Sequence, residues 1–496
     1  MISFEEFKRL AREGNVIPLW EELPVDTETP VSVYRKVRPL SPLSVLLESV
    51  EGGEHIARYS FLGFNPFMKF TIEGGNFRVD PLHEDVSVLP GLARQARGPV
   101  EALKTIFDHL KTVRLPGLPR FAGGAVGYFG YECARLVERL PEAPPDDLSL
   151  PDAVLLFFDV LIVFDNVKHQ VVIVSNAYVP DPEVDDRSLR KEYETAAAEI
   201  SRVKEILRGS DPIPERKKVM IGEKSHLLEK QTFCSMVESA KRFIEAGDVF
   251  QVVLSHRVRQ IATADPFDVY RNLRRINPSP YMYFLSLGEF SIMGCSPEML
   301  VRIEGDTVHT RPIAGTRRRG TTEAEDAILE KSLLEDPKER AEHLMLVDLG
   351  RNDLGRICTY GSVHVTDFMK VEKYSHVMHL VSEIRGRLRP GLSVIEGLFA
   401  CFPAGTLTGA PKIRAMEIIA ETEPVRRGVY GGAIAYLDFS GNLDSCITIR
   451  TIVAHGDTLY FQAGAGVVHD SVPGREYEET LEKMHATMKA VEMMKR

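Results

Sequence analysis

Cysteine is scarce in this chain: its 496 residues include six cysteines, which lie far apart and form no C-x-x-C pair. This spacing suggests neither a zinc site nor a disulfide framework, and it fits a reducing compartment such as the cytoplasm. Long apolar runs are also missing, because the most apolar stretch, residues 153–164, contains Asp159 and is far too short to span a membrane. The first residues predict an amphipathic helix rather than a signal peptide.

Positive charge is the other shortage. The chain has 61 Lys and Arg residues against 71 Asp and Glu residues, which gives a formal net charge of -10. The one dense basic cluster, residues 317–319, is short and is interpreted as a solvated loop, so no nucleic-acid partner is expected. With 44% hydrophobic and 27% charged residues, the composition is typical of a folded globular protein rather than a disordered one.

Two regions are predicted, residues 1–215 and 216–496, joined by a linker near residues 208–218 where glycine, proline and charges interrupt a helical pattern. Many strands at hairpin-like spacing predict an α+β fold, with large, mainly antiparallel sheets in a sandwich-like core and helices packed outside. The strands expected in the first region are residues 31–35, 67–72, 76–79, 154–164 and 170–174.

Two acidic helix starts are the first candidates for chemistry. Asp336 is a plausible N-cap with proline in the first turn, and it predicts a helix that presents Glu339 and Glu342 on one face. Glu476 and Glu479 repeat this arrangement on a second predicted helix. The two carboxylate pairs could enclose one Mg²⁺, with water and substrate oxygens completing the octahedron. Acidic residues also favour the helix dipole and pair with Lys or Arg on surfaces, so a structural role stays open for each helix.

Two donor-rich segments could hold an anion. Residues 402–412 supply backbone N–H groups, hydroxyls and Lys412, and residues 462–466 contain a G-A-G sequence after an apolar stretch. The second segment predicts a strand that runs into a turn whose backbone an anion can approach closely, although it is not a dinucleotide-binding fingerprint. Arg450 could offer a planar fork to a carboxylate, or it could pair with a local acid.

Proton transfer has two candidate residues. Glu298 follows a predicted strand and turn, where a partly desolvated carboxyl group can act as a proton donor. His379 could act as an acid or base, although a lone histidine is more often structural. The sequence contains no G-x-S-x-G elbow or other convincing nucleophile motif, which disfavours ordinary hydrolase chemistry.

Several motifs in order over residues 225–496 together closely resemble the chorismate-utilising enzymes, and in particular the branch that makes anthranilate. The first region matches more loosely, through residues 46–49 and 123–127. The motifs that carry the resemblance are residues 277–282, 294–298, 311–316, 342–353, 402–412 and 462–466.

The resemblance implies a Mg²⁺-dependent reaction in which ammonia adds to chorismate at C2, the C4 hydroxyl leaves, and pyruvate is eliminated to give anthranilate. By analogy, Glu298 protonates the departing hydroxyl, His379 assists the elimination, and Thr406 lines the ring. The implied metal shell comprises Glu339, Glu342, Glu476 and Glu479. The implied substrate contacts are Gly315, Thr316, Tyr430, Arg450, Gly464, Ala465 and Gly466.

Two positions distinguish the branches of this family. Relatives that add water, making isochorismate or salicylate, resemble one another in carrying a lysine base where this chain has Gln251, which cannot deprotonate water. Relatives that make 4-amino-4-deoxychorismate carry a nucleophilic lysine where this chain has Ala314. An isochorismate or salicylate synthase is therefore an alternative that Gln251 disfavours. A second alternative is a non-catalytic tryptophan-binding regulator, which would need neither Glu298 nor Arg450.

The resemblance also implies regulation and a partner. Residues 1–215 would contribute to a tryptophan site for feedback inhibition, and residues 216–496 would form the catalytic region. Because no glutaminase motif is visible, ammonia would come free or from a separate glutamine amidotransferase, component II, in a heterotetramer of two copies of each subunit. The implied inhibitor residues, which could equally be core and turn residues, are Ser49, Pro280, Tyr281 and Met282.

Overall fold

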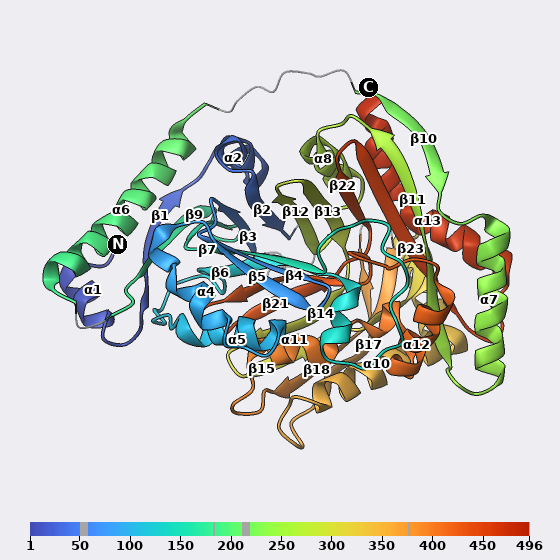
Figure 1. Ribbon diagram of the computed structural model, residues 1–496. Helices are drawn as coiled ribbons and strands as arrows, with labels where there is room; N and C mark the ends of the chain where they lie inside the picture. The colour runs from blue at the N-terminus through green and yellow to red at the C-terminus, as the bar shows by residue number, and fades with distance from the viewer. Residues whose placement is uncertain (50–57, 182–183, 211–218, 375–376, 496) are drawn as a thin grey trace.

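The strands of the chain form two large antiparallel sheets that face each other, and helices cover their outer sides (Figure 1). The computed structural model describes residues 1–495 except 50–57, 182–183, 211–218 and 375–376. Between the sheets, Phe61 and Tyr283 of the first sheet pack against Tyr128 and Tyr436 of the second in one apolar core. The predicted α+β sandwich with outer helices is therefore confirmed.

The first sheet combines strands from both ends of the chain. Its strands follow the order β1 (Val16–Pro24), β9 (Gln170–Tyr178), β8 (Val160–Asp165), β3 (Tyr59–Phe64), β2 (Leu43–Glu48), β12 (Tyr281–Leu287), β13 (Phe290–Ser296), β22 (Thr451–His455), β23 (Thr458–Val467), β11 (Gln251–Ala262) and β10 (Ile221–His226), and β19 (Gly409–Ala410) also pairs with β11.

The second sheet is built in the same mixed way. Its strands follow the order β16 (Ile313–Arg318), β18 (Val377–Arg387), β15 (Thr307–Thr310), β14 (Met299–Glu304), β21 (Leu443–Ile447), β20 (Ala433–Asp438), β6 (Gly124–Phe129), β7 (Ala153–Phe158), β4 (Met68–Glu73) and β5 (Asn76–Pro81), and β17 (His364–Lys373) also pairs with β18.

Helices bury the outer faces of the sheets in two further apolar cores. On the first sheet lie α1 (Phe4–Leu10), α2 (Pro30–Val37), α6 (Asp186–Arg208), α8 (Pro266–Ile276) and α13 (Pro473–Glu492). On the second sheet lie α4 (Val88–Ala93), α5 (Pro99–His109), α9 (Glu323–Glu335), α10 (Pro337–Gly355) and α11 (Val394–Cys401), while α7 (Lys230–Glu245) and α12 (Lys412–Thr422) pack on β11. Short 3-10 helices are η1 (Arg38–Leu40), η2 (Glu84–Val86), η3 (Tyr131–Leu136), η4 (Gly405–Leu407) and η5 (Met493–Lys495).

The two predicted regions share both sheets. Strand β2 of the first region pairs with β12 of the second, and β6 pairs with β20. Helix α6 ends at Arg208, within the predicted linker, but residues 211–218 and the predicted boundary at residue 215 lie outside the described residues. The division into a regulatory and a catalytic region stays a prediction. All six cysteines are unpaired, and no helix in the described part of the chain is long and apolar enough to cross a bilayer.

Two predicted strands were wrong. Residues 31–35, predicted as a strand, lie in α2, because Thr29 and Ser32 form a reciprocal capping box and Pro30 suits the first turn. These helix-start signals outweigh the strand propensity of the valines and tyrosine that follow. Residues 154–164, predicted as one strand, form β7 and β8, which separate at Asp159 and belong to different sheets.

Candidate functional site

The start of β11 brings the two donor-rich segments together. Gln251 pairs with Ala410 of the first segment, and Val253 pairs with Gly466 of the second. A Cβ on Gly466 would stand 2.6 Å from Nε2 of Gln251, so a larger residue here would displace the Gln251 side chain. Gln251, which separates the branches of the resembled family, is therefore buried between the segments expected to hold the substrate.

The G-A-G sequence lies inside β23, not in the predicted turn. β23 continues to Val467 because β11 pairs with it along its length, whereas pairing with β22 stops at Phe461. After Phe461, the edge of β23 that faces away from β11 therefore has no strand partner among the described residues. Arg450, the residue just before β22, lies on this side. An open backbone edge beside an arginine can receive an anion.

Tyr430 and Lys483 approach Gly464 from two other parts of the fold. A Cβ on Gly464 would stand 2.8 Å from the Tyr430 hydroxyl, and Lys483 of α13 donates a hydrogen bond to the Gly464 carbonyl at 3.0 Å. Burial raises the pKa of Tyr430, so its hydroxyl keeps its proton and can donate a hydrogen bond.

Arg450 has a cationic side chain without a partner among the described residues: its guanidinium forms no ion pair or hydrogen bond there. Its backbone lies in the left-handed region, with φ of 49°, and its carbonyl accepts a hydrogen bond from the Cys295 N–H at 3.2 Å. Its charge reaches both Glu298 and His379. No acidic side chain among the described residues forms an ion pair with Arg450, so its fork is available for a carboxylate.

Glu298 lies in the connection between β13 and β14, and its carbonyl accepts a hydrogen bond from the Ile447 N–H at 3.0 Å. Burial raises the pKa of Glu298 to about 7, although the Thr406 hydroxyl and the charges of Arg450 and Lys483 oppose the rise. A carboxyl group in this range is partly protonated near neutral pH and can act as a proton donor.

Thr406 lies in η4, directly after Gly405. Its buried hydroxyl oxygen has no geometrically good hydrogen-bond partner among the described residues. Because this hydroxyl acts on the Glu298 carboxyl group without good hydrogen-bond geometry, a bound ligand can complete its hydrogen bonding.

His379 on β18 faces Thr316 on β16, its register partner. Its Nδ1 lies 3.0 Å from the Gly315 carbonyl and 3.1 Å from the Thr316 hydroxyl. Because a carbonyl can only accept, we assign the proton to Nδ1, which leaves Nε2 as the acceptor. Burial lowers the pKa of His379, and the neutral ring can therefore take up a proton through Nε2.

The acidic helices form as predicted, and their four carboxylates influence one another. Asp336 caps α10 by accepting hydrogen bonds from the N–H groups of residues 338 and 339. Desolvation raises the pKa of Glu342, and the charges of Glu339 and Glu479 raise it further. Desolvation and the charge of Glu479 also raise the pKa of Glu476. This repulsion is an electrostatic cost that a bound cation would remove.

Two of these carboxylates are engaged by cations. Glu339 pairs with Arg317 at 2.9 Å, and Glu479 pairs with Lys483 at 2.7 Å. No cluster of three or more potential metal-binding side chains forms among the described residues. Carboxylate oxygens are the ligands that Mg²⁺ prefers, so the residue types fit that ion, but Glu339 and Glu479 would have to turn from their partners to bind it.

The sequence predicted Lys412 as a donor to the site, but its charge is neutralised elsewhere. Its ammonium group is buried against the Asp353 carboxylate at 2.8 and 2.9 Å and the Cys401 carbonyl at 3.1 Å. The pair joins α12 to α10 and supports the donor-rich loop from behind. Arg427, which contacts the same loop, was missed from the sequence because a buried arginine has no distinctive pattern there.

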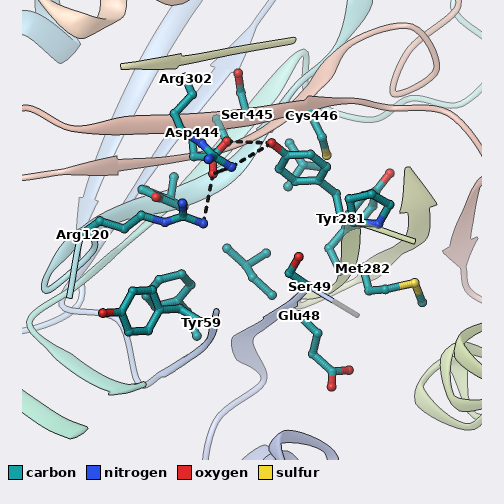
Figure 2. A pocket seen from close by; sticks show the side chains of 17 residues that line it. Glu48, Ser49, Tyr59, Arg120, Tyr281, Met282, Arg302, Asp444, Ser445 and Cys446 are labelled. Carbon is teal, nitrogen blue, oxygen red and sulfur yellow. Dashed lines mark hydrogen bonds and ion pairs between the residues drawn. The ribbon is translucent and has the colours of Figure 1, made fainter. Parts of the chain in front are cut away.

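All four predicted inhibitor residues line a separate pocket (Figure 2). The Ser49 hydroxyl there is buried and has no partner in the described structure. The Tyr281 hydroxyl donates to Asp444 at 3.1 Å. Met282 borders the pocket, but its side chain packs with Phe284 in the core on the opposite face of β12.

The pocket and the site around Glu298 share two strands. Tyr281 pairs with Ser296, two residues before Glu298, and Cys446 of the pocket lies on β21, which leads to Arg450.

The chain belongs to the family described as chorismate binding enzyme, which matches residues 46–489. It is similar to anthranilate synthase component 1 from Acetivibrio thermocellus, with 47% identity over 99% of this chain and 98% of the relative, and from Pseudomonas putida, with 46% identity over 98% of each.

Two solved structures are similar as well. The crystal structure of anthranilate synthase component I from Streptococcus pneumoniae TIGR4 has 38% identity and a TM-score of 0.75, covering 87% of this chain and 92% of that one. The menaquinone-specific isochorismate synthase from Escherichia coli has a TM-score of 0.70 over 98% of each chain, but at 18% identity it indicates the shared fold alone.

Proposed function

We propose that this chain is the synthase subunit that converts chorismate and ammonia to anthranilate and pyruvate in tryptophan biosynthesis. The observation that carries the proposal is the position of Gln251 against Gly466, where a side chain that cannot act as a base adjoins the strand of the substrate site. Water would need a base there, whereas ammonia does not. The full-length similarity to relatives named anthranilate synthase component 1 supports the same reaction.

Each step of the proposed reaction uses residues of the candidate site. The fork of Arg450, the Tyr430 hydroxyl and the amides of residues 464–466 hold the enolpyruvyl carboxylate. As the ammonia nitrogen bonds to C2, the C4–O bond breaks and Glu298 supplies the proton, so the hydroxyl leaves as water. The ammonium group formed at C2 loses one proton to solvent. Nε2 of His379 then takes the proton from C2, the C3–O bond breaks, and the ring becomes aromatic. The departing enolpyruvate takes up a proton at its methylene carbon and becomes pyruvate. Thr406, Gly315 and Thr316 position the ring.

Mg²⁺ would be held by Glu339, Glu342, Glu476 and Glu479. When bound, it neutralises the ring carboxylate of the substrate and makes the conjugated ring more electrophilic. Two observations support this assignment. The carboxylates repel one another, and their oxygens are the ligand atoms that Mg²⁺ prefers.

The proposal is tested by incubating the purified chain with chorismate, Mg²⁺ and ammonia at mildly alkaline pH and following anthranilate fluorescence. We expect anthranilate, and we expect its formation to stop when a chelator removes Mg²⁺ and to resume when Mg²⁺ is added back. Isochorismate as product would select the water-adding alternative. Unreacted chorismate, together with tryptophan binding, would select the non-catalytic regulator.

With glutamine as the nitrogen source, we propose that a separate amidotransferase subunit supplies ammonia in a heterotetramer of two copies of each subunit. Glutamine should support turnover only after component II is added, and light scattering should give the mass of the tetramer. The six unpaired cysteines support a cytoplasmic location for this assembly.

The activity should depend on pH through Glu298. Because this carboxyl group must be protonated to donate, kcat/KM for chorismate at a constant concentration of neutral ammonia should fall as pH rises through about 7. The charge of Arg450 lowers the pKa of Glu298, and a bound substrate carboxylate neutralises that charge. The pKa of Glu298 is then higher in the substrate complex, so kcat should fall at a higher pH than kcat/KM. Profiles that stay flat through this range would contradict the assigned role.

We propose that the pocket shown in Figure 2 binds tryptophan, with Ser49 at the polar head group and Pro280 and Tyr281 around the indole, while the Met282 side chain stays in the core on the opposite face of β12. Ser49→Arg should fill the pocket and raise the tryptophan concentration for half-inhibition by at least about tenfold, or ~1.4 kcal/mol. Uninhibited turnover should stay within about twofold of the parent. Ser201→Arg on the exposed face of α6 is the matched control, and equal loss of turnover and inhibition in Ser49→Arg would contradict the proposal.

A further inference from the structure

Arg427 is a fully buried arginine between α12 and Tyr430, with 1% of its surface exposed. It forms a bidentate ion pair with Glu423, in which Nε lies 2.9 Å from Oε2 and Nη2 lies 2.7 Å from Oε1. Charges are buried this completely only when they are paired and hydrogen-bonded. The ion pair with Glu423 therefore explains how Arg427 can be buried. It does not explain why this position carries a charged side chain at all.

The other hydrogen bonds of the guanidinium reach backbone in the candidate active site. Nη1 donates to the carbonyl of Leu407, the residue after Thr406, at 2.6 Å. Nη2 donates to the carbonyl of Val253, the register partner of Gly466, at 2.7 Å. One planar group thus ties the loop of Thr406 to the strand beside the glycines.

The same guanidinium also contacts the ring of Tyr430. Its central carbon lies 5.7 Å from the centroid of that ring and 4.7 Å from the centroid of Tyr131. The backbone of this segment is fixed as well, because Glu132 accepts hydrogen bonds from the N–H groups of Arg427 at 3.1 Å and Gly428 at 3.0 Å. Cation–π contacts of this kind hold an aromatic ring against a rigid support.

Glu423 extends the contact to the other glycine. Its Oε1 accepts hydrogen bonds from the N–H of Ser255 at 2.8 Å and from its hydroxyl at 3.0 Å, and Ser255 is the register partner of Gly464. The buried pair therefore contacts Tyr430 and holds β11, the strand that pairs with Gly464 and Gly466.

We propose that Arg427, held by Glu423, is a positioning residue that sets Thr406, Tyr430 and the strand of Gly464 and Gly466 at the separations that chorismate requires. The inference rests on the proposed function and deepens it. Arg427 acts through these residues and does not itself contact the substrate. A lysine would keep the charge but could not bridge two carbonyls and a carboxylate in one plane.

Two variants test the proposal. Arg427→Lys keeps the charge and loses the fork, and Arg427→Gln combined with Glu423→Gln removes both charges, so no buried charge is left unpaired. In both, kcat/KM for chorismate should fall by about 10²-fold, as expected when reacting groups move by about 1 Å. The KM for ammonia should change less than about threefold, because Arg427 positions no group for ammonia.

The matched control is Lys36→Met with Glu28→Gln, which removes a largely buried ion pair of 2.5 Å between α2 and the residues just before it, outside the candidate site. This control should lower the melting temperature and leave kcat/KM unchanged. Calorimetric titration with chorismate in the absence of ammonia should show at least about tenfold weaker binding in the Arg427 variants and none of this loss in the control.

A lower melting temperature in the Arg427 variants with unchanged kcat, KM and chorismate affinity would overturn the proposal. Failure of both variants to fold at the assay temperature would also overturn it, because Arg427 would then serve the fold alone. Failure of the proposed function is a different result: the folded parent chain would bind chorismate and form no anthranilate.

Discussion

Glu298→Gln will lower the rate of anthranilate formation by about 10³-fold at saturating chorismate and ammonia, within the range that a general acid contributes. Glutamine has nearly the same shape and leaves the hydrogen bond from the Ile447 N–H to the carbonyl of residue 298 intact. It cannot deliver a proton to the departing hydroxyl. The rate is measured by anthranilate fluorescence, and its decline above pH 7 should disappear in the variant.

The control for this variant is Glu289→Gln, which makes the same change on the exposed turn between β12 and β13 and should be neutral. Calorimetric titration should show that Glu298→Gln still binds chorismate, because the loss lies in the chemical step. A variant that retains a tenth or more of the parent rate would assign the proton to another donor.

Arg450→Gln will lower kcat/KM for chorismate by about 10²–10³-fold, chiefly through KM, because a partly buried carboxylate loses its charged partner, at a cost of about 3–4 kcal/mol. The guanidinium has no partner among the described residues, so the substitution breaks no ion pair there and should change the melting temperature little. Steady-state kinetics with chorismate as the varied substrate measure the effect.

Arg450→Lys should recover part of this loss, because it restores the charge without the planar fork. Arg78→Gln on the exposed strand β5 is the control for loss of an arginine and should leave both kinetic constants unchanged. If Arg450→Gln lowered kcat with no change in KM, Arg450 would act in the transition state rather than in substrate binding.

Helix starts could be predicted from the sequence because their signals are local. Asp336 and the proline after it fix the beginning of α10, and with it the face that carries Glu339 and Glu342. What the sequence left open was whether this face meets that of Glu476 and Glu479, since α10 and α13 approach through tertiary packing. The same limit applies to Gln251, whose place beside Gly466 depends on the pairing of β11 with β23.

The buried ion pairs and the crossing between sheets could not be predicted, because their sequence patterns also occur in ordinary surface residues. Arg427 stands four residues after Glu423, which is the spacing of an ordinary surface pair on a helix, yet both side chains are buried. Lys412 sits among donors but is neutralised by Asp353, far away in the chain. Asp159 interrupts an apolar run at the point where the chain passes between sheets, and one polar residue does not reveal such a crossing.

The mixed composition of both sheets has a consequence for synthesis on the ribosome. Strands β2 and β6 emerge early, but their partners β12 and β20 are made much later. Until then, the first half of the nascent chain exposes strand edges that can pair with other chains. Such long-range pairing also makes folding slow. The protein therefore depends on completion of its C-terminal strands, and a truncated translation product would be prone to aggregate rather than persist as a folded fragment.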